Sequence, residues 1–309
     1  MSPEARWAWL GVALITALRL ILIGEVGLGD DEAYYWDWSR QLDWSYYDHP
    51  PMVAWLIAGS TAIAGDTAWA VRLPFTLLAV LGGALTWTLS TRLWPKRPEV
   101  AALAMVAFHC VPILSLSAVF AAPDLPMIVC WLGLSLMGLR AHRTGRTRDW
   151  LVAGLIAGLG LLSKYTMVLS LLGLLGWLLT SVRGRAQLRA RGPWLGICLS
   201  LLLFLPVLIW NAERDWISFA FHLSGRHRHQ VDILTQAGTF AGSQLLAASP
   251  IMVVALVMGL WKPPEAEARV TALLRWQAIP VLVLFALTSP LTSFKAHWTA
   301  PGWALALGL

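Results

Sequence analysis

Residues 194–210 read WLGICLSLLLFLPVLIW and contain no charged side chain. The hydrocarbon core of a membrane offers the backbone no hydrogen-bond partner, so a chain that enters it must form helices or a closed barrel. Strands of a barrel alternate apolar and polar residues, and this run does not. The run therefore predicts a membrane-spanning helix and an all-α polytopic membrane protein.

The composition of the whole chain excludes a soluble protein. Of its 309 residues 58% are hydrophobic and 13% are charged, whereas soluble domains carry roughly a quarter charged residues. The net charge of +6 does not indicate nucleic-acid binding, because the basic residues cluster between apolar runs, as membrane topology signals do. Cys110, Cys130 and Cys198 lie inside apolar runs without metal-ligand spacing, which is typical of small buried residues.

Other apolar runs predict the remaining crossings. They cover residues 7–24, 73–94, 100–120, 125–141, 240–261 and 276–289. The stretch 150–182 is too long for one span and is interrupted by Ser163, Lys164 and Tyr165, so we expect a helical pair there. A last run starts at residue 299 and is too short to cross. We therefore expect a single transmembrane domain over residues 1–309, truncated at its C-terminus.

Basic connections set the expected orientation. Arginine and lysine residues concentrate in the connections 92–97, 140–148 and 183–191, and the positive-inside rule places all three in the cytoplasm. Alternation of the crossings then puts Lys164 on the outer side. It also places residues 25–51, 121–124, 211–239 and 290–298 there.

One outer loop, residues 25–51 within an outer segment 25–72, is both acidic and aromatic. Seven of the seventeen acidic residues of the chain are Glu25, Asp30, Asp31, Glu32, Asp37, Asp43 and Asp48. They are interleaved with Tyr34, Tyr35, Trp36, Trp38, Trp44, Tyr46 and Tyr47. An interfacial aromatic belt is one interpretation. Because adjacent like charges repel, the acidic cluster favours a general base or a divalent cation site.

The loop ends at Asp48-His49-Pro50-Pro51. The two prolines fix the backbone and stop any preceding helix, which holds Asp48 and His49 at a rigid turn. The following apolar segment, residues 52–64, is short for a span and is expected to lie along the membrane interface.

These motifs resemble those of a known family. Asp31-Glu32-Ala33-Tyr34-Tyr35-Trp36 and Tyr47-Asp48-His49-Pro50-Pro51 are similar to the first outer loop of bacterial glycosyltransferase family 39 proteins. These are relatives of protein O-mannosyltransferases and lipid A aminoarabinose transferases, with the GT-C fold. The resemblance continues through Val71-Arg72-Leu73-Pro74, Ala122-Pro123-Asp124, Ser163-Lys164-Tyr165-Thr166, Trp210-Asn211 and Lys295-Ala296-His297-Trp298.

The resemblance implies a membrane glycosyltransferase that inverts configuration. A polyprenyl-phosphate sugar would be the donor, and a protein, lipid or glycan the acceptor, on the outer side of the bacterial cytoplasmic membrane. Asp31 matches the catalytic base or metal-site ligand, and Glu32 is its partner in catalysis or in binding a divalent metal ion.

A lipid-linked sugar also needs a cation at its phosphate. Lys164 and Lys295 are the two lysines predicted outside, each beside apolar sequence, and a membrane-edge lysine indicates function, although lysine also snorkels without any role. Arg226 lies in a basic run, residues 226–229, that would bind a lipid phosphate or only an anionic surface. Asp124 would join the site or cap the helix that follows it. The substrate-binding candidates are Asp30, Tyr34, Tyr35, Asp48, His49, Asp124, Tyr165 and His297.

Two other classes of protein remain open. A transporter or flippase of lipid-linked sugars would also have many spans, but its polar residues would gather near the bilayer midplane and not in an outer loop. A non-catalytic scaffold subunit would leave the acidic cluster without a purpose.

Overall fold

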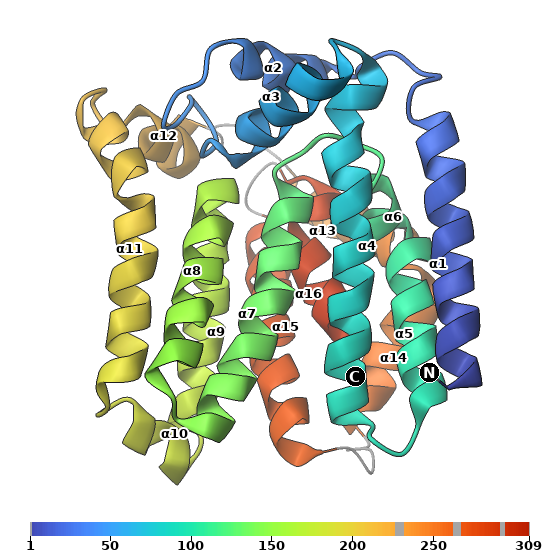
Figure 1. Ribbon diagram of the computed structural model, residues 1–309, viewed down its shortest axis with the longest axis vertical. Helices are drawn as coiled ribbons and strands as arrows, with labels where there is room; N and C mark the ends of the chain where they lie inside the picture. The colour runs from blue at the N-terminus through green and yellow to red at the C-terminus, as the bar shows by residue number, and fades with distance from the viewer. Residues whose placement is uncertain (1, 226–231, 262–266, 291–293, 309) are drawn as a thin grey trace.

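The computed structural model describes residues 2–225, 232–261, 267–290 and 294–308, and these residues fold into a bundle of helices (Figure 1). The long helices stand side by side across the bundle. They are α1 Pro3–Leu22, α4 Ala68–Leu93, α7 Asp124–Thr144, α8 Thr147–Ser163, α9 Val168–Leu179, α11 Arg191–Ala212 and α15 Ala268–Thr288. Two shorter helices, α2 Asp30–Arg40 and α3 Met52–Ala64, lie across one end.

Five helices in the described residues are long and apolar enough to cross a membrane. They are α1, α4, α7, α11 and α15, and they match five of the predicted spans. The predicted position of residues 52–64 is also confirmed, because α3 lies across the end of the bundle. It packs Val53, Ala54 and Ile57 inward. The chain is therefore a multi-pass membrane protein.

Two predicted continuous helices are broken at prolines. The run 100–120 forms α5 Pro98–Cys110 and α6 Pro112–Ser117, and the run 240–261 forms α13 Ile233–Ala248 and α14 Pro250–Trp261. Proline has no N–H to donate and its ring crowds the preceding turn, and at Pro112 and Pro250 the preceding helix ends. At the first break the guanidinium of Arg19 donates to the carbonyl oxygen of His109 at 2.7 Å, which gives that carbonyl a partner inside the bundle.

The stretch 150–182 forms the predicted helical pair. Helix α8 ends at Ser163, Lys164 is extended with φ −156° and ψ 136°, and a 3-10 turn over Tyr165–Met167 leads into α9. The Ser163 hydroxyl donates to the carbonyl oxygen of Pro123 at 2.7 Å. This bond fixes the turn against the start of α7.

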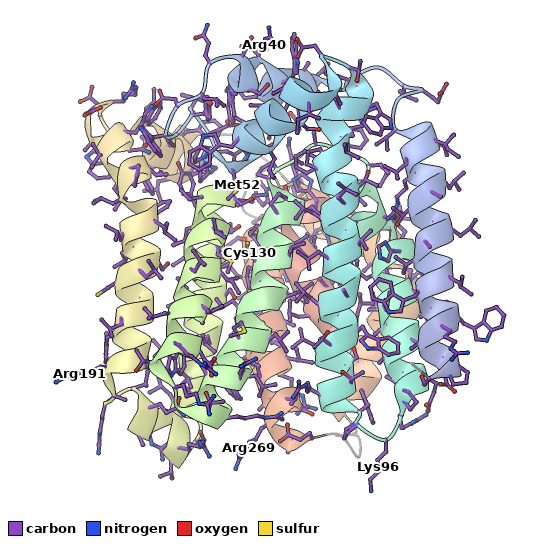
Figure 2. The ribbon with its side chains drawn as sticks, in the orientation of Figure 1. Arg40, Met52, Lys96, Cys130, Arg191 and Arg269 are labelled. Carbon is purple, nitrogen blue, oxygen red and sulfur yellow. The ribbon has the colours of Figure 1, made fainter. Side chains whose placement is uncertain are left out.

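Members of two predicted basic connections lie at the same end of the bundle. Lys96 and Arg191 are there together with Arg269, and Arg40 lies at the other end, beside α2 and α3 (Figure 2). We call the first the basic end and the second the α2/α3 end. Lys164 lies toward the α2/α3 end, as the alternation of crossings predicts.

Helices α8 and α11 pack backbone to backbone. A Cβ atom added at Gly154 would lie 2.1 Å from the carbonyl oxygen of Gly196, far inside van der Waals contact. We predict that Gly154→Ala lowers the free energy of unfolding by about 2 kcal/mol, the usual penalty of overpacking. Gly59→Ala in α3 is the matched control, because nothing lies within 4 Å of its added Cβ. Thermal unfolding in detergent measures both, and equal midpoints would contradict this packing.

Candidate active site

The loop between α2 and α3 is held rigidly by aromatic side chains. The rings of Trp38 and Tyr46 stack with centroids 4.3 Å apart. The Tyr46 hydroxyl donates to the carbonyl oxygens of Trp38 and Gln41 at 3.0 and 3.1 Å and accepts the N–H of Asp43. These contacts account for the buried part of the predicted aromatic belt. They also fix the backbone that carries Asp48 and His49.

Beneath α2 and this loop lies a cavity of about 530 Å³, which we call the polar cavity. It is bounded by α2, α6, the start of α7, the α8–α9 turn and the segment around residue 296. Nine of the predicted site residues line it: Asp30, Asp31, Tyr35, Asp48, His49, Asp124, Lys164, Lys295 and His297. Asp31 and Lys164, 133 positions apart, therefore share one cavity at the α2/α3 end.

Lys164 forms a buried ion pair. Its ammonium lies 2.7 Å from Oδ1 of Asp124, and the two side chains are 10% and 5% exposed. Pro123 is the N-cap residue of α7, and Asp124 follows it as the first residue of the helix. Asp124 thus does not act as the cap, which was one of the two predictions for it. Without this carboxylate the lysine would be a costly unpaired charge.

A second lysine pairs with the predicted base. The ammonium of Lys295 lies 3.1 Å from Oδ2 of Asp31, and both side chains are about half exposed, at 47% and 65%. The pair therefore remains open to exchange with a ligand. It joins α2 to a segment 264 positions later in the chain.

The prediction that Glu32 acts beside Asp31 is wrong. Its side chain is fully buried and forms an ion pair with Arg72 at 2.6 Å. The same carboxylate accepts the N–H groups of Gly29 and Ala121, each at 3.0 Å. Consecutive residues of a helix point about 100° apart, so Glu32 faces the bundle while Asp31 faces the cavity. Glu32 has no free oxygen for catalysis.

Arg72 is the residue that the sequence reasoning missed. Beyond Glu32, its guanidinium donates to the carbonyl oxygens of Ile23, Val26 and Gly27 at 2.7 to 2.9 Å. It appeared in the sequence only within Val71-Arg72-Leu73-Pro74. The available signal was a single arginine directly before the predicted span 73–94, because an arginine at the membrane edge needs an acidic or carbonyl partner.

The residues do not fit the metal site predicted at Asp31 and Glu32. Among the described residues no group of three His, Cys, Asp or Glu side chains lies close enough to hold a metal ion. The Glu32 oxygens are taken by Arg72 and backbone N–H groups, and a lysine ammonium stands at Asp31. We therefore assign no chemistry to a metal.

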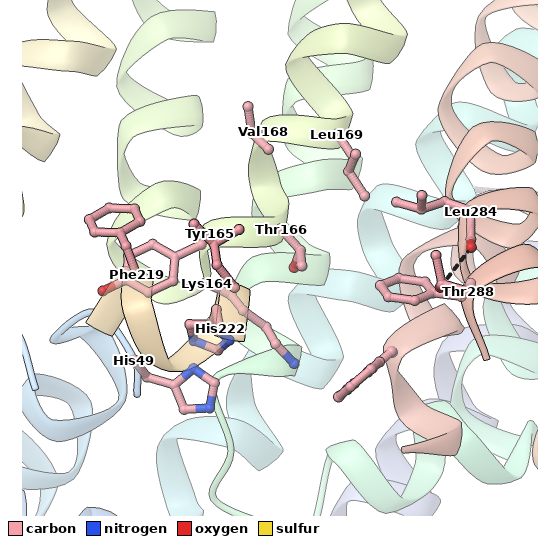
Figure 3. A pocket seen from close by; sticks show the side chains of 13 residues that line it. His49, Lys164, Tyr165, Thr166, Val168, Leu169, Phe219, His222, Leu284 and Thr288 are labelled. Atoms are coloured by element: carbon pink, nitrogen blue, oxygen red, sulfur yellow. Dashed lines mark hydrogen bonds between the residues drawn. The ribbon is translucent and has the colours of Figure 1, made fainter. Parts of the chain in front are cut away.

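A second cavity of about 450 Å³, which we call the apolar cavity, adjoins the polar one (Figure 3). His49, Lys164 and Trp298 line both cavities. Figure 3 shows His49, Lys164 and His222 at one end of the apolar cavity, and Leu169 and Leu284 toward the other. Its remaining lining is mostly apolar: Tyr165, Thr166, Val168, Phe219, Leu223, Phe285 and Thr288.

Two predicted substrate-binding residues, Tyr165 and Tyr34, do not line the polar cavity. Tyr165 lines the apolar cavity. Tyr34 packs on Trp38 with ring centroids 4.5 Å apart and is 40% exposed, outside the lining of both cavities. Arg226, with the rest of the run 226–229, lies outside the described residues. His222, from the same loop, does reach the site, where its Nε2 lies 2.7 Å from the carbonyl oxygen of Asp48.

The pKa of His297 gives a pH prediction. Burial lowers this pKa below its ordinary value, and Lys164 and Lys295 lower it further, while Asp124 acts in the opposite direction. The unfolded chain therefore binds the proton at higher pH than the folded chain, so protonation favours unfolding as the pH falls below about 6.5. We expect the stability of the wild type to fall between pH 7 and 5 more than that of His297→Gln. Thermal midpoints across this range test it, and parallel curves would contradict it.

The fold and this site define a polytopic membrane protein of the GT-C class. Over 99% of its length the chain is similar to ArnT of Cupriavidus metallidurans bound to undecaprenyl phosphate, with a TM-score of 0.78, 20% identity and 60% of that chain covered. It is also similar to the oligosaccharyltransferase AglB of Archaeoglobus fulgidus, with a TM-score of 0.58, 13% identity and coverage of 99% and 50%.

The chain belongs to the dolichyl-phosphate-mannose-protein mannosyltransferase family, which matches residues 48–210, more than half of its length. It is 26% identical to the lipid A galacturonosyltransferase RgtD of Rhizobium johnstonii over 88% of this chain and 58% of that protein. It is 30% identical to an undecaprenyl phosphate-alpha-4-amino-4-deoxy-L-arabinose arabinosyl transferase of Pseudomonas fluorescens, over 66% and 36%. The chain thus spans about half the length of these curated relatives.

Proposed function

We propose that the chain carries the catalytic site of a glycosyltransferase that uses a polyprenyl-phosphate sugar. The observation that carries this proposal is the junction of the two cavities at Lys164 and His49. A ligand that fits both must have an apolar tail, an anionic centre and a polar head. A polyprenyl-phosphate sugar has these three parts in that order.

This match of chemistry supports the following position for the donor. The polyprenyl chain occupies the apolar cavity, between α9 and α15. Its phosphate meets Lys164 at the junction, where an ammonium in a weakly hydrated site stabilises the charge that grows as the glycosidic bond breaks. The sugar enters the polar cavity, where Asp31, Lys295 and His297 lie.

The reaction follows from this placement. Asp31 removes the proton from an acceptor hydroxyl or amine, which attacks the anomeric carbon on the face opposite the phosphate. The bond from the anomeric carbon to the phosphate oxygen breaks, polyprenyl phosphate leaves with the electron pair, and the configuration inverts. If the Lys295 ammonium moved from Asp31 to the phosphate of the donor, the Asp31 carboxylate would be free to take up the proton of the acceptor.

The names of the relatives favour a lipid acceptor. RgtD is named a lipid A galacturonosyltransferase, a name that gives a lipid as the acceptor. We therefore propose a lipid or glycan acceptor of the cell envelope in preference to a protein. The basic end faces the cytoplasm by the positive-inside rule, so the reaction takes place on the opposite side of the cytoplasmic membrane.

A flippase of lipid-linked sugars is the rival function. It would carry its charged residues along a path through the bundle. Asp31, Asp124, Lys164 and Lys295 instead gather at the α2/α3 end, which supports transfer at one face.

Binding and transfer by the purified protein test the proposal. The double variant Lys164→Met/Asp124→Asn removes the buried charges together, so that no unpaired charge remains. We expect its affinity for undecaprenyl phosphate to fall at least about tenfold, the worth of one charge-assisted hydrogen bond, with sugar transfer from a panel of polyprenyl-phosphate sugars falling in parallel.

Lys96→Met is the matched control, because it removes a lysine at the basic end. It should leave affinity and transfer unchanged. Equal affinities of wild type and double variant would remove Lys164 from phosphate binding. Movement of intact donor across vesicles without any transfer would favour the flippase.

A further inference from the structure

A groove on the membrane-facing side of α11 lies apart from both cavities. It has a volume of about 540 Å³. Leu202, Leu205, Pro206 and Ile209 line its apolar part, and their spacing of three and four places them on one face of the helix. Leu202, Leu205 and Ile209 are 64%, 43% and 50% exposed. Since α11 crosses the membrane, this face lies against lipid chains.

The outer end of the groove is charged and aromatic. Trp44 and Trp210 line it together with Asp43, Glu213 and Arg214. The Arg214 guanidinium lies 3.6 Å from carboxylate oxygens of both Asp43 and Glu213 and 4.3 Å from the centre of the Trp210 ring. All three charged side chains are partly exposed, at 39%, 66% and 44% for Asp43, Glu213 and Arg214.

The charged end of the groove suits an amphipathic ligand whose headgroup carries a positive and a negative charge. Tryptophan is the residue of headgroup depth, and the apolar stripe continues from there along α11 toward the bilayer centre. Two carboxylates face one guanidinium, so the rim carries a net negative charge. A headgroup ammonium is therefore favoured over a purely anionic headgroup, and the guanidinium supplies a partner for a phosphate.

We propose that the groove binds a phospholipid with a primary ammonium headgroup. The ammonium lies between Asp43 and Glu213, the phosphate meets Arg214, and one acyl chain follows Leu205 and Leu202. A quaternary ammonium cannot donate hydrogen bonds to the carboxylates, so a choline lipid binds less tightly. An anionic glycerol lipid is repelled by the rim.

The bound lipid would stabilise the loop between α2 and α3, which carries His49 of the candidate active site. Asp43 Oδ2 accepts the indole N–H of Trp210 at 2.6 Å, and the carbonyl oxygen of Asp43 accepts that of Trp55 at 3.3 Å. Six residues later the same loop presents His49 to both cavities. The groove thus includes Asp43, which is held by hydrogen bonds at the start of the loop segment that carries His49 into the candidate active site. The proposal itself rests on the groove and not on the proposed function.

Native mass spectrometry of the detergent-purified full chain tests the site. Equal amounts of phosphatidylethanolamine, phosphatidylcholine and phosphatidylglycerol with identical acyl chains are offered to each variant. We expect the wild type to retain phosphatidylethanolamine about tenfold over the others. In Asp43→Asn/Glu213→Gln this preference is lost, while the asparagine keeps an oxygen for the Trp210 indole.

The control is Glu25→Gln/Asp66→Asn, the same pair of changes outside the groove. It should keep the preference, and thermal midpoints should show that both double variants fold. Equal retention of the three lipids by the wild type, a preference for phosphatidylglycerol, or an unchanged preference in the groove variant would each overturn the proposal.

Discussion

Asp31→Asn is expected to lower sugar transfer by about a hundredfold to ten-thousandfold, the usual contribution of a general base. Asparagine is nearly isosteric with aspartate but cannot take up the proton of the acceptor. Affinity for undecaprenyl phosphate should stay constant or rise, because Lys295 loses its ion pair and becomes free for the phosphate. Steady-state transfer and lipid binding, measured on one preparation, separate the two effects.

Asp30→Asn is the matched control for this prediction. Asp30 precedes Asp31 in α2 and lines the same polar cavity, so its replacement changes the local charge equally. We expect only a few-fold change in transfer. Equal losses in both variants would indicate a general effect of charge, and retained transfer in Asp31→Asn would remove Asp31 as the base.

Arg72→Met should destabilise the protein by about 3 to 5 kcal/mol, because it leaves the carboxylate of Glu32 buried without its partner. It also leaves three backbone carbonyls before α2 without a donor. The segment 23–29 and α2 should then lose their place over the polar cavity. The measurement is thermal and denaturant unfolding in detergent.

Two further variants show whether the buried charge is the cause. Arg72→Met/Glu32→Gln should recover part of the loss, since glutamine still accepts the N–H groups of Gly29 and Ala121 but carries no charge. Arg40→Met breaks an ion pair with Asp66 whose side chains are 51% and 43% exposed, and it should change stability by at most about 1 kcal/mol. Equal effects of Arg72→Met and Arg40→Met would contradict the account.

Much of the fold follows from hydrophobic length and charge. The apolar runs and basic connections predict α1, α4, α7, α11 and α15 and the end of the bundle at which Lys164 lies. The breaks at prolines were harder to predict from the sequence. Pro112 and Pro250 end helices although the apolar runs around them are continuous, whereas Pro74, Pro206 and Pro280 lie inside unbroken helices. Whether a proline ends a helix depends on its tertiary neighbours.

The site was predictable at the level of segments but not of side-chain direction. The motifs from residue 30 to residue 297 could be assigned to one end of the bundle, because the alternation of crossings puts them all on the same side. Adjacent acids could not be told apart, since the face that each presents depends on the start of α2 at Asp30. Arg72 decides this difference, because its fixed position in α4 draws Glu32 inward and leaves Asp31 exposed.

The most direct measurement of the central claim is labelling of Lys295→Cys by a membrane-impermeant maleimide in spheroplasts. The variant is made in a chain without Cys110, Cys130 and Cys198, and Lys96→Cys serves as the control at the basic end. The account predicts that Lys295→Cys reacts from outside, that added undecaprenyl phosphate slows the reaction, and that Lys96→Cys reacts only after the membrane is opened. Reaction of Lys295→Cys only after opening, or at a rate that the lipid leaves unchanged, would contradict it.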